Sequence, residues 1–108
     1  MNNPRRRYFR CPVTLAVSLR TASGDHLKCT SINLSSNGLA LNTPAPQELG
    51  AEVNVLVELP TGDTIAGNGV VIWDDKHGKA GIHFHCHSPE MQSKLDSWLE
   101  DRSANSGI

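Results

Sequence analysis

The fold is decided by residues 13–41, which read VTLAVSLRTASGDHLKCTSINLSSNGLAL. Apolar residues alternate with small or polar ones over Val13–Leu19, and a second strand-like stretch spans His26–Asn33. A period of two is typical of β-strands that bury one face. The glycine-containing segment 21–25 lies between the two stretches and favours a chain reversal. We therefore expect the two stretches to pair as an antiparallel hairpin.

Further strand-like stretches follow this hairpin along the chain. Turns rich in glycine, proline, serine and asparagine separate them, as is typical of small all-β domains. The four stretches are Leu39–Leu41, Val53–Leu59, Thr64–Trp73 and Lys79–His85.

The pattern becomes helical after residue 87. Ser88 is a typical N-cap residue, and Pro89 suits the first helical position. Apolar residues then recur with helical spacing at Met91, Leu95, Trp98 and Leu99. We predict an all-β fold, a six-stranded antiparallel β-barrel with a C-terminal α-helix.

The chain length suits one domain with three parts. We expect residues 1–10 to form an arginine-rich N-terminal arm and residues 11–87 the barrel. Residues 88–102 are expected to form a helix packed on that barrel.

Charge and cysteine content exclude several classes of protein. The first ten residues hold four of the ten basic residues and none of the eleven acidic ones, which leaves a net charge of −5 on the remainder. A protein that binds nucleic-acid polymers usually spreads basic charge over one face, so we do not expect that function. Three widely spaced cysteines favour free thiols in the cytoplasm over a disulfide framework or a cysteine-based zinc site. No apolar run is long enough to span a membrane.

Two polar motifs are candidates for ligand binding. The first is the cluster Arg5-Arg6-Arg7-Tyr8-Phe9-Arg10, whose guanidinium groups match phosphates and the O6/N7 edge of guanine. The second is Asn33-Leu34-Ser35-Ser36-Asn37-Gly38, in which Asn33 and Ser35 would share a strand face and Gly38 permits positive φ. A solvated basic tail and an ordinary chain reversal are the alternative interpretations.

The hairpin links the two motifs in space. Because its turn lies near Gly24, the start of the first strand and the end of the second lie at the same end. Arg10 and Asn33 should therefore be neighbours, as the recognition of a phosphorylated ligand would require.

With these motifs the sequence resembles the PilZ domain family, the bacterial receptor module for cyclic di-GMP. The family pattern R-R-x-x-x-R matches residues 5–10, and (D/N)-x-S-x-x-G matches residues 33–38. Residues 70–73 and 80–84 resemble the last strands of the family. The resemblance covers roughly residues 5–99.

The resemblance implies a role for each motif residue. Arg6 and Arg10, assisted by Arg5, would contact the phosphates and guanine edges of cyclic di-GMP, while Asn33, Ser35 and Gly38 would hold its other side. The ligand often enters this family as a stacked pair, over which the arm folds. The signal would then pass to an unidentified downstream protein. A ligand-independent protein–protein adaptor of the same fold is the alternative.

Other residues carry weaker indications. Trp73 could stack on a guanine or pack in the barrel core or rim. His83, His85 and His87 would share one strand face, but adjacent strand histidines enclose an ion poorly, so we expect no metal site. No acid–base pair or nucleophile constellation is present in the sequence, and we expect no enzyme activity.

Overall fold

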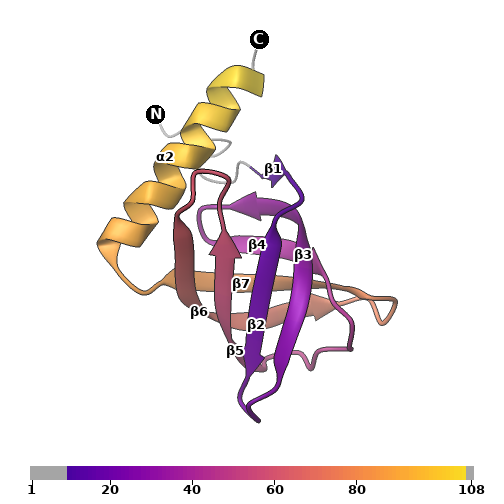
Figure 1. The fold of residues 1–108 in the computed structure, drawn as a ribbon. Helices are drawn as coiled ribbons and strands as arrows, with labels where there is room; N and C mark the ends of the chain where they lie inside the picture. The colour runs from indigo at the N-terminus through magenta and orange to yellow at the C-terminus, as the bar shows by residue number, and fades with distance from the viewer. Residues whose placement is uncertain (1–9, 107–108) are drawn as a thin grey trace, which may run out of the picture.

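Seven β-strands and one α-helix make up residues 10–106, the part of the chain that the computed structural model describes (Figure 1). The elements are β1 (Cys11–Pro12), β2 (Ala16–Thr21), β3 (His26–Ser35), β4 (Gly38–Asn42), β5 (Glu52–Glu58), β6 (Thr64–Asp74), β7 (Lys79–Cys86) and α2 (Pro89–Ser106).

Six of these strands close into an antiparallel barrel, as predicted. The order is β3-β2-β5-β6-β7-β4, and pairing of β3 with β4 completes the ring. The seventh strand, β1, pairs only with the end of β3 and was not predicted as a separate element. The hairpin of β2 and β3 is confirmed, with Gly24 at a φ of 94° in its turn.

Alternation along the strands builds the core. In β5, Val53, Val55 and Val57 are buried while Glu52 and Asn54 are exposed, because successive strand residues face opposite sides of the sheet. The same alternation operates in the other long strands, and the largest fully buried side chain is Phe84 of β7. The residues that alternate with the buried ones therefore form the outer face of the barrel.

The predicted strand Val13–Leu19 is interrupted where β3 bulges. Residues 13–15 leave the ladder between β1 and β2, and the β3–β4 register shifts between Ser31 and Asn33. The buried Ser31 hydroxyl fills the gap, since it accepts a hydrogen bond from the Leu15 N–H at 2.8 Å and donates to the Val13 carbonyl. The alternation pattern of residues 13–19 could not predict this interruption, because it depends on a hydroxyl from another strand.

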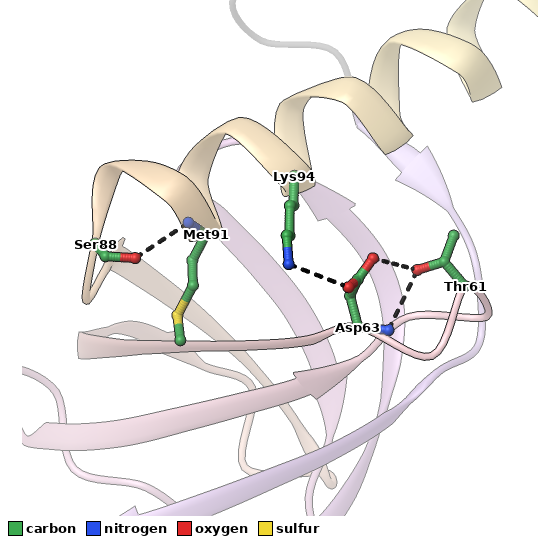
Figure 2. A network of polar contacts seen from close by, with 5 residues as sticks. All are labelled: Thr61, Asp63, Ser88, Met91 and Lys94. Atoms are coloured by element: carbon green, nitrogen blue, oxygen red, sulfur yellow. Dashed lines mark hydrogen bonds and ion pairs between the residues drawn. The ribbon is translucent and has the colours of Figure 1, made fainter.

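Helix α2 begins as predicted and ends later than predicted. The Met91 N–H donates to the Ser88 hydroxyl at 3.1 Å, which makes Ser88 the N-cap (Figure 2). Leu95 and Leu99 are buried in the core, with Met91 and Trp98 packed against it. The helix continues to Ser106, four residues beyond the predicted end.

A surface contact also joins α2 to the β5–β6 hairpin. Lys94 Nζ lies 3.4 Å from Asp63 Oδ1, and the Thr61 hydroxyl donates to the other oxygen of that carboxylate (Figure 2). Both charged side chains are substantially exposed, so the ion pair adds little to stability. Within residues 10–106, no helix has both the length and the apolar character needed to cross a membrane.

Candidate functional site

Arg10 and Asn33 are in direct contact. Arg10 Nη1 donates to Asn33 Oδ1 at 3.1 Å across 23 positions of sequence. Pairing of β1 with β3 brings them together, because Pro12 lies opposite Asn33 and Cys11 opposite Leu34. The neighbourhood predicted from hairpin geometry is confirmed. Arg5 and Arg6 lie outside the described residues, as does the rest of the predicted arm up to residue 9.

The second motif forms the tight connection between β3 and β4. Leu34 is fully buried, so its neighbours Asn33 and Ser35 lie on the opposite face of the strand and share that face, as predicted. Ser35 is nevertheless only 3% exposed. Its hydroxyl lies within hydrogen-bonding distance of the Gly38 carbonyl oxygen (3.1 Å) and of Asn37 Oδ1 (3.3 Å). In this structure Ser35 shapes the turn.

Gly38 is required for a different reason than positive φ. Its φ is not in the left-handed region, where Gly24, Gly50, Gly62 and Gly78 lie. A Cβ at Gly38 would instead lie 2.9 Å from the Ile82 carbonyl oxygen of β7. The Phe84 N–H also donates to the Asn37 carbonyl at 3.0 Å. The turn is therefore seated directly on the backbone of β7.

A transverse row of paired residues extends from Asn33 across four strands. Asn33 pairs with Ala40, Ala40 with Gly81, and Gly81 with Trp73. The row has small residues in the middle and a functional group at each end. With adjacent strands about 4.8 Å apart, Asn33 and Trp73 are separated by roughly 14 Å along the sheet.

Trp73 lies on the outer surface of the barrel and not in its core. The residue is 41% exposed, and its indole covers the space that a Cβ on Gly81 would occupy. The structure excludes core packing of Trp73 and shows its indole packed on Gly81 at the barrel surface, beside the candidate site.

Three further residues join the site without having been predicted there. Ala40 and Gly81, both buried, form a floor that the Trp73 indole covers at Gly81, and His83 lies opposite Gly38 with an exposed side chain. These positions come together only through the β4–β7 register. The sequence carries no signal for that register, although the two-residue periodicity indicates which side chains of each strand face outward.

The histidine face is only partly as expected. His83 and His85 are exposed, with ring centroids 5.3 Å apart, while Ile82 and Phe84 face the core. His87 lies beyond the end of β7, and its Nε2 is 3.1 Å from Asn68 Oδ1. No group of three potential metal ligands occurs in the described part of the chain.

Helix α2 is tied to the back of the turn. Gln92 Nε2 donates to the Ser36 carbonyl at 2.8 Å and to Asp96 Oδ1 at 3.0 Å. The carbonyl belongs to the motif itself, so the helix position and the turn position depend on each other. The first-turn residues of the helix thus support the candidate site from behind.

The assembled surface suits a flat ligand with negative charge. Arg10 offers a planar fork of donors for phosphate or a guanine edge. Asn33 adds an amide, and the indole of Trp73, which lies over Gly81, presents a π-face. Together these groups can bind both the charged and the aromatic parts of a nucleotide.

Several solved structures share this fold. The MotI/DgrA inhibitor of motility from Bacillus subtilis has a TM-score of 0.79 and 22% identity; the match covers 94% of this chain and 52% of that one, so this chain spans about half of that protein. The PilZ domain of YcgR from Escherichia coli, solved with cyclic di-GMP, has a TM-score of 0.71 and 16% identity, with 94% of each chain covered. The PilZ domain of CeSA from a cellulose-synthesizing bacterium has a TM-score of 0.66 and 18% identity, over 85% of this chain and 95% of that one.

These low identities concern the fold, and a comparison with curated protein sequences gave no match. The sequence itself matches the family model of the PilZ domain over residues 4–101. That match includes both polar motifs and all seven strands. The chain belongs to the PilZ domain family.

Proposed function

We propose that this protein is a receptor for cyclic di-GMP. The observation that carries the proposal is the hydrogen bond between Arg10 and Asn33, because it joins the two polar motifs at one place on the barrel. Membership of the PilZ family and the nucleotide in the YcgR structure support the same ligand class.

The proposed roles follow the chemistry of each group. Arg6 and Arg10, with Arg5, bind the phosphates and the guanine edges through charge-assisted hydrogen bonds. Asn33 orients Arg10 and offers its amide to the ligand, while Ser35 and Gly38 hold the turn in the shape that the ligand contacts. Trp73 stacks on a guanine at the far end of the floor.

The proposal includes a path for the signal. The N-terminal arm becomes ordered over the ligand, which is a single molecule or a stacked pair, and a downstream protein recognises the new surface. The three cysteines are free thiols, which suits the cytoplasm, where the nucleotide would be met. The protein acts by binding and not by catalysis.

Calorimetric titration with cyclic di-GMP tests the proposal, with GMP and cyclic di-AMP as ligand controls. Selective binding is expected, and Arg6→Ala and Arg10→Ala should each weaken it by roughly ten- to hundredfold, because each removes hydrogen bonds to charged groups. Arg20→Ala is the matched control, since Arg20 is an exposed arginine near the opposite end of the β2–β3 hairpin. Equal affinity in Arg10→Ala and Arg20→Ala would contradict the assignment.

A ligand-independent adaptor is the second candidate. Exposed apolar side chains on the barrel favour it, since such surfaces mark protein contacts. An adaptor would bind its partner with the same affinity whether or not cyclic di-GMP is added. A folded protein that does not bind the nucleotide would favour this candidate.

A further inference from the structure

Exposed apolar side chains gather at the end of β6. Among the described residues, five large hydrophobic side chains are exposed, and four of them belong to β6 or to the segment beside it. They are Leu49 (68% exposed), Val70 (40%), Ile72 (52%) and Trp73 (41%), which we call the β6 patch. The fifth, Leu56, lies on β5.

A β-bulge creates part of this exposure. The β6–β7 register shifts between Val71 and Trp73, so the alternation of buried and exposed residues fails after Ile72. Ile72 and Trp73 are therefore both exposed although they are consecutive, whereas Val71 is buried. Bulges re-aim side chains in this way and are common next to functional sites.

Hydrogen bonds hold Leu49 beside the bulge. The Gln47 N–H donates to Asp74 Oδ2 at 2.7 Å, and the Gly50 N–H donates to the Val71 carbonyl at 2.8 Å. The Val71 N–H donates in turn to the Ala51 carbonyl at 3.0 Å. These hydrogen bonds hold residues 47–51 beside the last residues of β6, and they fix the position of Leu49 on the surface.

Two exposed glutamates lie at the border of the β6 patch, which also includes His83, the partner of Val70 in β7. Glu48 precedes Leu49, and Glu52 lies opposite Val70 in the β5–β6 ladder. Both glutamates are exposed, and neither forms an ion pair with any residue between 10 and 106. Carboxylates at such a border favour a cationic partner and disfavour phosphate groups, whether of nucleic acids or of anionic lipids.

We infer that the β6 patch is a docking surface for a protein segment that presents apolar side chains flanked by lysine or arginine. The apolar side chains of the partner would pack on Leu49, Val70 and Ile72, and its basic residues would pair with Glu48 and Glu52. The inference does not rest on nucleotide binding. Trp73, however, borders both surfaces, so a bound nucleotide would lie directly beside the partner.

Two synthetic peptides with identical leucine positions test the inference. One carries lysine and the other glutamate at the intervening positions, and fluorescence anisotropy reports binding to the full chain without nucleotide. The lysine peptide is expected to bind. Ile72→Ser should lower the affinity for this peptide by roughly tenfold, as expected when one aliphatic side chain is no longer buried against the partner. The double variant Glu48→Gln with Glu52→Gln should weaken it as well.

Leu56→Ser is the matched control, since it removes an exposed leucine outside the patch and should leave binding unchanged. Thermal unfolding verifies that the variants are folded. The inference is overturned if the lysine peptide does not bind, if both peptides bind equally, or if Ile72→Ser and Leu56→Ser have equal effects. It is also overturned if the chain is a dimer that Ile72→Ser dissociates, because the occupant is then a second copy.

Discussion

Gln92 donates a hydrogen bond from its side-chain amide to the backbone carbonyl of Ser36, at 2.8 Å. The contact connects helix α2 to the turn that carries the second polar motif. If the turn rearranged around a ligand, the Ser36 carbonyl would move, and the hydrogen bond from helix α2 would be strained or broken.

Gln92→Ala is predicted to lower the free energy of unfolding by about 1 kcal/mol, because it removes a hydrogen bond and leaves a carbonyl without its partner. We also expect weaker nucleotide binding, since the turn is less well held. Denaturant unfolding and calorimetry measure the two effects. Ser93→Ala, at an exposed helix position, is the control. Alanine raises helix propensity at both positions, so an equal loss of stability in the two variants would contradict a specific role of the Ser36 contact.

Ser31→Ala is predicted to be among the more damaging small substitutions. Ser31 is buried, and its hydroxyl bonds both the Leu15 N–H and the Val13 carbonyl where β1 and β2 separate. Removing it leaves both backbone groups unpaired in the interior, which should cost about 1–3 kcal/mol of stability. Ser18→Ala, on the exposed face of β2, should change the free energy of unfolding by less than about 0.5 kcal/mol. Equal stability of the two variants would refute this role.

Much of the barrel could be predicted from the sequence because its strands alternate strictly. Val53, Val55 and Val57 alternate with polar or exposed residues, and the structure buries these three. The break before Ala16 could not be predicted, because it depends on a hydroxyl from another strand. The bulge at Ile72 could not be predicted either, because it depends on the β6–β7 register.

The candidate site was predictable only where one hairpin defines it. Arg10 and Asn33 meet because β1, β2 and β3 are consecutive in sequence, so chain reversal alone places them at one end. Trp73 and Gly81 reach the same surface through the pairing of β4, β7 and β6, whose register depends on the whole core. Local patterns carry no information about that register.

The Asp74 carboxylate should control the order of residues 47–51 in acid. Hydrogen bonds from the Gln47 and then the Lys76 backbone N–H lower the pKa of Asp74 below its ordinary value of 3.8. A lowered pKa means that the stabilising contribution is present above the unfolded-state value and is lost as pH falls through the folded-state value. We therefore expect the Gln47 amide signal in NMR to titrate below pH 3.8.

Asp74→Asn provides the comparison for this titration. It keeps one acceptor oxygen but removes the titrating charge, so the Gln47 amide signal should no longer follow pH in that range. Persistence of the titration in Asp74→Asn would show that another group controls it.

Gly38→Ala is predicted to damage the second motif through its neighbour strand. The new Cβ would lie 2.9 Å from the Ile82 carbonyl oxygen, and a backbone atom cannot move aside without separating β4 from β7. A loss of about 1–3 kcal/mol in stability is expected, as for other forced contacts in packed regions. Nucleotide affinity should fall too, because the turn is displaced.

Gly24→Ala separates the two consequences. Gly24 has a φ of 94°, and no atom lies within 4 Å of the position that a Cβ would take, so its substitution strains a hairpin turn at the far end from Asn33 without a clash. It should reduce stability while nucleotide affinity stays at the level of the unmodified protein. Weakened binding in both variants would mean that general destabilisation, and not the position of the turn, lowers affinity.

Gly81→Ala is predicted to displace the indole of Trp73. A Cβ at residue 81 would overlap the indole, and because Trp73 is 41% exposed the ring has room to swing outward. In a Trp98→Phe background Trp73 is the sole tryptophan, so its emission should shift to longer wavelength as the ring becomes more hydrated. Nucleotide affinity should fall as well, because the displaced indole can no longer stack on a base at this site. The same substitution in a Trp73→Phe background should leave Trp98 emission unchanged, whereas an equal shift there would indicate a general loosening of the barrel.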